Sequence, residues 1–236
     1  MTRHFGVLIP STNTTVEIEY TRLLPPEWQA HYARVLSQSH GGSPFAPPLD
    51  ADVAYQSKLL GTARVEIIAL IQTSACLFAD DYDETTCARI TEGSGGIPAI
   101  TSAMAIGEAA LALGTRRVAL VSPYSEEVNA RAKRFFEQKH GLTVAAIEGF
   151  AAKDSYMIGQ LGPENARDAF GRIDRPEIEA FVVPGGNFPT MQSIPQWERE
   201  LDKPVIATNQ AALWAMMRRL GSRDTISGLG RLLERA

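Results

Sequence analysis

The 236-residue chain runs twice, in the same order, through short apolar segments that are each followed by a helix-like segment. Several correspondences in one order are hard to obtain by chance, so the pattern predicts two equivalent lobes. Three pairs of segments correspond: Gly6–Ser11 with Val118–Tyr124, Ile67–Leu70 with Ala180–Val183, and Pro98–Ala103 with Pro204–Ala211.

Alternation of strands and helices is typical of a parallel sheet with helices on both faces, so we predict an α/β fold with one parallel four-stranded sheet per lobe. The first lobe is expected at 1–114 and the second at 115–209, with a C-terminal helix at about 210–236 packing back on the first. Strands are predicted at 5–9, 30–36, 66–71, 98–100, 117–121, 142–147, 180–183 and 204–207. Helices are predicted at 13–23, 51–65, 79–92, 102–113, 125–140, 163–173, 194–201 and 210–220, and a loop rich in Gly, Pro and Ser at 39–48.

Composition argues against several classes of partner. The net charge is -4 and the C-terminal arginines are interrupted by Asp and Glu, so no basic stripe is available for nucleic acid. No apolar run approaches the roughly 20 residues that span a bilayer, and the N-terminus does not resemble a signal peptide. We therefore expect a cytoplasmic protein without a membrane partner. Two cysteines, four scattered histidines and no C-x-x-C motif argue against a disulfide framework and a metal site.

Polar residues, glycine or cysteine follow four of the predicted strands. The carboxyl ends of parallel strands meet at the ligand crevice of an α/β sheet, so these segments are expected to share one site. Free N–H groups at the starts of the following helices favour anions, which suits a small carboxylate or dicarboxylate. The candidate substrate-binding residues are Ser11, Asn13, Leu77, Tyr124, Gly185, Gly186 and Asn187.

Cys76 is the candidate catalytic nucleophile, because a thiol at a helix N-terminus can have its pKa lowered toward neutrality. The competing interpretation is a small apolar residue packed behind a strand. The sequence contains no P-loop, no G-x-G-x-x-G after the first strand and no G-x-S-x-G elbow. Chemistry without a cofactor is therefore expected.

The binding candidates have competing structural interpretations as well. Tyr124 either donates a hydrogen bond to a ligand oxygen or packs over a strand end. Asn13 and Asn187 either bind a carboxylate or cap helices. Gly185-Gly186 forms either an oxyanion hole or a tight turn.

Together these segments resemble the aspartate/glutamate racemase superfamily, in the branch that contains maleate cis–trans isomerase and arylmalonate decarboxylase. The resemblance covers essentially the whole chain. It implies two Rossmann-like lobes with pseudo-twofold symmetry, a site between them, no metal, no organic cofactor, and a homodimer. It rests on Gly6–Glu17, Ala75–Leu77, Val121–Tyr124, Gly185–Asn187, Asn209–Ala211 and Gly228–Leu232.

The resemblance also implies a pattern of cysteines that this chain carries only in part. Racemases of the superfamily use one cysteine from each lobe. In maleate isomerases the first-lobe cysteine adds to the double bond and the second assists, whereas arylmalonate decarboxylases keep the second-lobe cysteine as a proton donor. Here Cys76 falls on the first-lobe position and Gly185 on the second, so a two-base racemase is disfavoured.

Three hypotheses about function follow. The first is a cofactor-independent isomerase of a small unsaturated dicarboxylate, with Cys76 as its single nucleophile. The second is a decarboxylase of a substituted malonate with Cys76 as a one-sided proton donor. A larger apolar cavity, walled by Leu77, Phe78, Phe188 and Met191, would favour the second. The third is a carboxylate-binding protein without activity.

Overall fold

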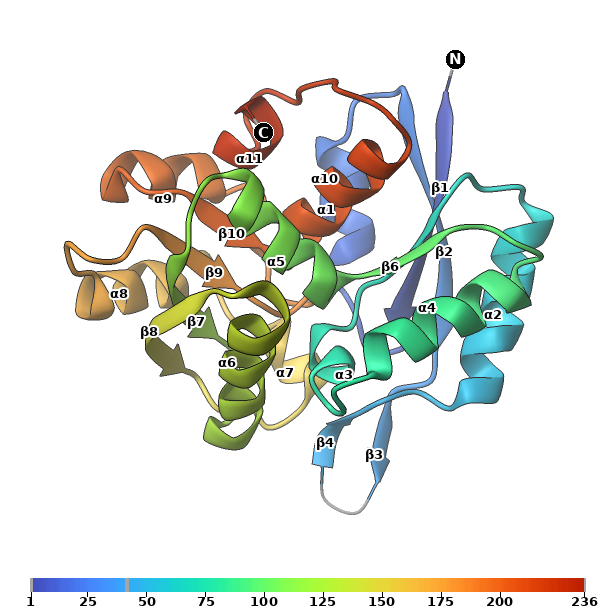
Figure 1. Ribbon diagram of the computed structural model, residues 1–236, viewed down its shortest axis with the longest axis horizontal. Helices are drawn as coiled ribbons and strands as arrows, with labels where there is room; N and C mark the ends of the chain where they lie inside the picture. Colours follow the sequence, from blue (N-terminus) through green and yellow to red (C-terminus); the bar gives the residue numbers. More distant parts are fainter. Residues whose placement is uncertain (1, 41–42, 236) are drawn as a thin grey trace.

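The computed structural model describes residues 2–40 and 43–235 and contains two four-stranded sheets, one in each half of the chain (Figure 1). All strand pairs within these two sheets are parallel, which confirms the predicted α/β fold. The first sheet contains β1 (Arg3–Pro10), β2 (Trp28–Val35), β5 (Ile68–Leu70) and β6 (Ala99–Thr101). The second contains β7 (Arg117–Ser122), β8 (Thr143–Gly149), β9 (Ala180–Val183) and β10 (Val205–Ala207).

The two sheets have the same topology. Their strands lie in the orders β2-β1-β5-β6 and β8-β7-β9-β10, so in each the second strand of the lobe flanks the first, followed by the third and fourth. The register is also equivalent, because β1 pairs Gly6 with Ile68 of β5 and β7 pairs Val118 with Ala180 of β9. The repeat in the sequence therefore corresponds to a repeat in backbone pairing.

Helices connect the strands and cover both faces of each sheet. In the first half they are α1 (Val16–Leu23), α2 (Asp50–Thr62), α3 (Thr73–Cys76), α4 (Tyr82–Gly93) and α5 (Ser102–Ala112). In the second half they are α6 (Glu126–His140), α7 (Ser155–Ile158), α8 (Pro163–Ile173), α9 (Ile194–Leu201), α10 (Thr208–Arg219) and α11 (Arg231–Arg235). None of these described helices is long and apolar enough to cross a membrane.

Several element boundaries follow from local chemistry. Thr101 caps α5 by accepting a hydrogen bond from the backbone N–H of Met104, and Gly141 ends α6 in the left-handed conformation. Pro163 stands at the start of α8, where its missing N–H costs nothing. The short helices α3 and α7 were not predicted, because segments of four residues carry no periodic pattern. The C-terminal helix predicted at about 210–236 consists of two helices, α10 and α11, separated by a non-helical segment at 220–230.

The prediction of a loop at 39–48 was wrong in part. Two short strands, β3 (Gln38–His40) and β4 (Ser43–Ala46), pair antiparallel beside the sheets. Gly41 and Gly42, which also fall in the predicted loop, lie outside the described residues. Backbone pairing between the two segments, rather than the β-propensity of their residues, makes them strands.

One apolar core extends through both lobes. It includes alternate residues of β1 and β5 and most of β7, β9 and β10, together with the buried faces of α5 and α10. In Figure 1, α5 and α10 lie centrally between the sheets, and they pack against each other. Helix α10 also contacts β5 and β6, while α5 contacts β10. A smaller cluster under α2 and α4 fills the outer face of the first sheet.

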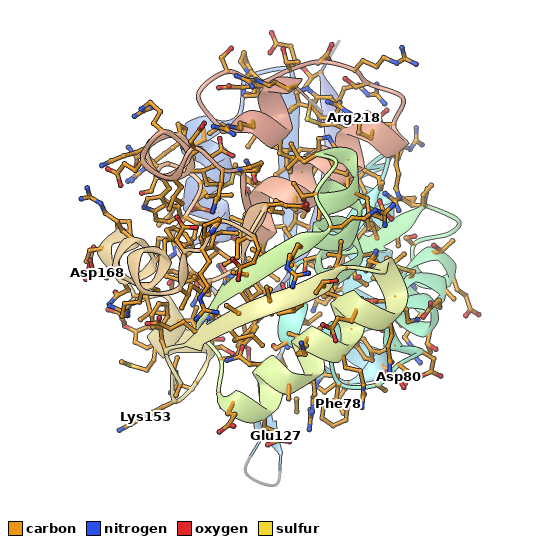
Figure 2. All side chains as sticks on the ribbon, turned by 60° about the vertical axis from the view of Figure 1, so that its left-hand side comes forward. Phe78, Asp80, Glu127, Lys153, Asp168 and Arg218 are labelled. Carbon is orange, nitrogen blue, oxygen red and sulfur yellow. The ribbon has the colours of Figure 1, made fainter. Side chains whose placement is uncertain are left out.

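Exposed polar contacts join the lobes along a second edge. Arg131 of α6 lies over the ring of Phe78, with its Cζ 5.1 Å from the ring centroid. Arg134 of α6 forms an ion pair of 2.9 Å with Asp80. Figure 2 shows Phe78, Asp80 and Glu127 along this lower edge. Exposed pairs of this kind contribute only about 0–1 kcal/mol each, so the shared core holds the lobes together.

Candidate active site

A small cleft lies between the lobes, where β1, β5, β7 and β9 end. In each sheet the strand order reverses between these neighbouring strands, and ligands of α/β proteins bind at such switch points. The cleft volume is about 20 Å³, close to the space that one water molecule needs. Its lining residues are Pro10, Thr12, Asn13, Ile71, Gln72, Thr73, Ser74, Tyr124, Ser155, Ile158, Gly185, Gly186 and Asn187.

The described residues that line the cleft are uncharged: hydroxyl and amide side chains stand among apolar ones, and none is Asp, Glu, Lys, Arg or His. Most of the surface that they expose to the cleft is apolar. Within residues 2–40 and 43–235, the backbone N–H of Gly186 has no hydrogen-bond partner. Neutral donors of this kind hold a carboxylate by hydrogen bonds and contribute no net charge of their own.

Cys76 does not line this cleft. Its side chain is fully buried, and its Sγ donates a weak hydrogen bond to the carbonyl oxygen of Gln72 at 3.5 Å. Cys76 is the last residue of the four-residue α3, so the expectation of a thiol at a helix N-terminus was wrong. The expected lowering of its pKa was wrong as well. Burial, followed by the neighbouring Asp83 carboxyl, raises the pKa of Cys76 well above its usual value.

Asp83 forms a buried cluster with Cys76 behind the cleft. Its Oδ1 accepts a hydrogen bond of 2.6 Å from the hydroxyl of Thr101, while its Oδ2 has no partner among the described residues. Burial raises the pKa of Asp83 to about 6, although the hydrogen bond from Thr101 opposes the shift. A thiolate at Cys76 would therefore lie beside the Asp83 carboxyl, whose own ionisation is disfavoured by burial.

Strand register identifies the first-lobe residue that corresponds to Gly185. Ile68 and Ala180 occupy equivalent positions, since they pair with Gly6 and Val118. Thr73 and Gly185 each lie five residues further on (73 − 68 and 185 − 180). The residue equivalent to Gly185 by symmetry is therefore Thr73, and the sequence-based pairing of Cys76 with Gly185 was wrong by three residues.

Buried hydroxyl groups connect these two equivalent positions. The Thr208 Oγ1 accepts a hydrogen bond of 2.8 Å from the N–H of Gly185 and lies 3.2 Å from the Oγ1 of Thr73. The Thr73 Oγ1 in turn lies 3.0 Å from the Oγ of Ser102. Because this chain of hydroxyls uses residues from both lobes, it fixes the two strand ends relative to each other.

Tyr124 lies over the same point, almost completely buried. Its hydroxyl interacts with Thr73 and Ser74, and a Cβ placed on Gly185 would lie 3.5 Å from the Tyr124 Oη. Burial raises the pKa of Tyr124, which keeps the phenol neutral and able to donate a hydrogen bond. The ring packs over a strand end, as one interpretation predicted, and the side chain also lines the cleft. Donation of a hydrogen bond to a ligand oxygen stays a prediction.

Gly185 and Gly186 lie so close to the side chains of Pro123 and Ile71 that neither position has room for a Cβ. Gly185 has a φ of 108°, and a Cβ there would stand 2.9 Å from the Cγ of Pro123. A Cβ on Gly186 would stand 2.5 Å from the Cγ2 of Ile71. The second-lobe strand end is therefore built from bare backbone, and Pro123 occupies the space in which a cysteine at 185 would begin.

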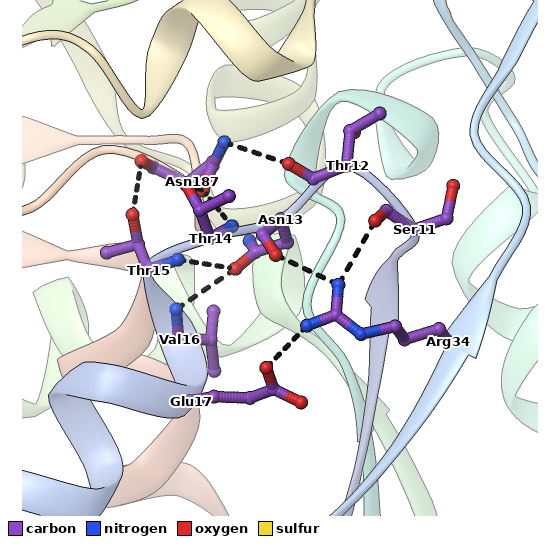
Figure 3. Close-up of polar contacts among 9 residues, drawn as sticks. All are labelled: Ser11, Thr12, Asn13, Thr14, Thr15, Val16, Glu17, Arg34 and Asn187. Carbon is purple, nitrogen blue, oxygen red and sulfur yellow. Dashed lines mark hydrogen bonds and ion pairs between the residues drawn. The ribbon is translucent and has the colours of Figure 1, made fainter.

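Asn13 and Asn187 line the cleft, but their side chains have structural partners (Figure 3). The Asn13 Oδ1 accepts hydrogen bonds of 3.0 Å from the N–H groups of Thr15 and Val16, so Asn13 caps α1. The Asn187 Oδ1 accepts from the N–H of Thr14 at 2.8 Å, and its Nδ2 donates to the carbonyl oxygen of Ser155 at 2.7 Å. Asn187 thereby ties α1 to α7.

Two of the predicted binding residues lie outside the cleft. Ser11 is exposed, its Oγ accepts a hydrogen bond from the N–H of Ser37, and its carbonyl oxygen accepts one from Arg34 (Figure 3). Leu77 is buried, and its N–H donates to the carbonyl oxygen of Ser74 at 3.3 Å. The N–H of Leu77 is therefore already engaged.

The proposed apolar walls are not part of the cleft either. Leu77, Phe188 and Met191 are buried in the core, whereas Phe78 is 45% exposed beneath Arg131. None of the four is among the lining residues.

Residues that the sequence interpretation missed make up much of the lining. They come from the second, third and fourth positions after the end of β5 and from α7, and they are Gln72, Thr73, Ser74, Ser155 and Ile158. Counting from the repeated strands would have found the first three, since Thr73-Ser74 stands where the second lobe has Gly185-Gly186. No sequence signal points to α7.

Known proteins resemble this chain over its full length. The sequence profile described as arylmalonate decarboxylase matches residues 6–233. The maleate isomerase of Alcaligenes faecalis is 23% identical over 249 residues, covering 98% of this chain and 96% of the relative. The solved maleate isomerase of Pseudomonas putida S16 with maleate has a TM-score of 0.91 at 24% identity, covering 100% and 99% of the two chains. A Nocardia farcinica maleate cis–trans isomerase variant with a covalently bound succinylcysteine intermediate has a TM-score of 0.88 at 23% identity, covering both chains fully.

These relatives share the two-lobed α/β fold described above, and the family profile spans nearly the whole chain. On this match, the chain belongs to the arylmalonate decarboxylase family.

Proposed function

We propose that this protein is a cofactor-independent isomerase that binds a small unsaturated dicarboxylate, of the maleate type, in the cleft between its lobes. The observation that carries this proposal is the cleft itself, where four strand ends from two equivalent lobes present neutral hydrogen-bond donors to one small volume. The full-length similarity to maleate isomerases supports the same substrate class.

Carboxylate binding follows from the donors around the cleft. Tyr124 and Ser74 offer hydroxyl groups, and Gly186 offers a backbone N–H. The cleft as described has room for about one water molecule, so a short dicarboxylate enters only when the lobes move apart, and donors from both lobes then reach its two ends. The low polarity of the buried cleft strengthens each of these hydrogen bonds relative to water.

Isomerisation requires a nucleophile, and Cys76 is the proposed one. The Cys76 thiol gives its proton to the neighbouring Asp83 carboxylate. The thiolate then adds to one alkene carbon, the π electrons move into the carboxylate at the far carbon, and the resulting enediolate is held by the donors. Rotation about the new single bond follows, and collapse of the enediolate breaks the C–S bond and restores the thiolate. Because Cys76 lies one helical turn behind Gln72, this step needs α3 to move so that Sγ enters the cleft.

One observation favours a second candidate, the decarboxylation of a substituted malonate. The described lining residues include no cysteine, and Tyr124, whose hydroxyl is neutral and carries a proton, is one of them. In this reaction the bond between the α-carbon and one carboxylate breaks and carbon dioxide leaves. The electron pair of that bond stays on the α-carbon and forms an enediolate, which the donors hold. The Tyr124 hydroxyl then gives its proton to carbon and recovers one from water.

Two substrates and two variants distinguish these functions. Maleate is incubated with the protein and fumarate is followed by proton NMR, while methylphenylmalonate in heavy water is followed for deuterated product. Isomerisation that disappears in Cys76→Ser but persists in Cys87→Ser supports the first function. Decarboxylation that disappears in Tyr124→Phe supports the second. If neither substrate turns over although both bind, the protein is a carboxylate-binding protein and both proposals are overturned.

A further inference from the structure

Gln72, one of the residues that line the cleft, carries a buried acceptor that nothing in the described protein satisfies. The residue is the second after the end of β5, is only 7% exposed and lines the cleft. Its Nε2 donates to the carbonyl oxygen of Ala46 at 3.4 Å, whereas its buried Oε1 has no hydrogen-bond partner among the described residues.

The orientation of this amide follows from its neighbour. If the amide were turned over, Oε1 would face the carbonyl oxygen of Ala46, and two acceptors would stand against each other. The Oε1 is therefore the atom left facing away from Ala46. A buried acceptor without a partner is costly, and such groups in native proteins call for an explanation.

A plain dicarboxylate does not supply the missing partner. Ionised carboxylates only accept hydrogen bonds, so they match Tyr124, Ser74 and the N–H of Gly186 but not the Oε1 of Gln72. An ammonium group would bring a positive charge to a cleft that is lined by no carboxylate. A neutral O–H or N–H group fits both conditions.

We infer that the ligand carries a neutral hydrogen-bond donor, a hydroxyl or an amide N–H, beside its carboxylate, and that the Oε1 of Gln72 accepts from it. This inference rests on the proposed carboxylate-binding site and specifies its substrate class: hydroxy-substituted dicarboxylates or their half-amides, in preference to unsubstituted ones. Gln72 is then a specificity-determining residue, because a site built to hydrogen-bond a ligand group discriminates against analogues that lack it.

Matched ligand pairs test this inference by isothermal titration calorimetry. Hydroxymalonate is compared with malonate, and the monoamide of maleate with maleate. One added hydrogen bond in a buried site corresponds to about tenfold in Kd, so the wild type is expected to bind the donor-bearing member of each pair about tenfold more tightly. The variant Gln72→Leu is expected to lose this preference, and the control Gln192→Leu, at an exposed glutamine outside the cleft, is expected to keep it.

Equal affinities within both pairs in the wild type, or a preference that survives in Gln72→Leu, would overturn the inference. Thermal melting without ligand checks that the variants are folded. If the wild type binds no member of either pair, the carboxylate site itself is wrong, and the inference about Gln72 falls with it. Binding of all four ligands without discrimination overturns only the role of Gln72.

Discussion

The segments that follow β5 and β9 occupy equivalent places in the two lobes, yet they present different groups to the cleft. After β5 the cleft is lined by side chains, those of Gln72, Thr73 and Ser74. After β9 it is lined by the backbone of Gly185 and Gly186, which lies against the side chains of Pro123 and Ile71, and by Asn187, whose side chain is engaged with Thr14 and Ser155. The first lobe therefore contributes hydroxyl and amide side chains to the cleft, whereas the second contributes backbone that a ligand can approach closely. The duplicated fold does not require duplicated chemistry, because backbone pairing sets the position of a strand end but not its side chains.

The largest expected effect tests the backbone half of this comparison. In Gly185→Ala, the φ of 108° and the contact with Pro123 are unfavourable for any Cβ. We expect the free energy of unfolding to fall by about 4 kcal/mol, measured by urea denaturation. The control Gly171→Ala lies in α8, where a Cβ meets nothing within 4 Å, and is expected to change stability by less than about 1 kcal/mol in either direction. If both changes lowered the free energy of unfolding equally, the claim that Gly185 has no room for a Cβ would be wrong.

A second prediction concerns Asp83, behind the side-chain half of the cleft. Its pKa is about 6 in the folded protein against 3.8 for the free group, so the folded state holds the proton more tightly. Stability should therefore fall as the pH rises from about 4 to 6, by up to about 3 kcal/mol, and stay low above pH 6. In Asp83→Asn this fall should disappear, so the gain over wild type is small at pH 4 and largest at pH 8.

The difference between variant and wild type isolates Asp83 from the other carboxyls. Urea denaturation at a series of pH values measures it, with Asp168→Asn on the exposed face of α8 as the control (Figure 2). If the Asp83→Asn difference is independent of pH, Asp83 is ionised as easily in the folded protein as in the unfolded chain.

The smallest of these effects probes the bridge between the two strand ends. In Thr208→Val, the N–H of Gly185 loses its acceptor and the Oγ1 of Thr73 loses a neighbour, at a place that is almost completely buried. A buried donor left without a partner costs about 2 kcal/mol. Thermal unfolding should show this loss, whereas Thr143→Val on exposed β8 should be close to neutral. Equal stability of Thr208→Val and wild type would show that the two ends are held by packing alone.

The order of elements could be predicted from the sequence alone. Apolar strands and helices alternate in two matching halves, and this pattern permits little other than two parallel sheets with polar residues at their carboxyl ends. The segments Pro163–Ile173, Ala180–Val183 and Ile194–Leu201 were predicted with their observed boundaries, since proline, glycine or strong periodicity marks their ends. Family membership followed from the same motifs.

Only the tertiary structure decided which side chains reach the cleft. Strand pairing set the register that brings Thr73 opposite Gly185 and leaves Cys76 one turn behind, and a shift of three residues is invisible to a pattern of apolar segments. The side chains of Asn13 and Asn187 have structural roles because they form hydrogen bonds to the start of α1 and to α7. The burial that raises the pKa of Cys76 comes from neighbours that are distant in the chain. Local sequence determines where a strand ends, whereas burial and partners, which determine chemistry, depend on segments that meet only in the folded protein.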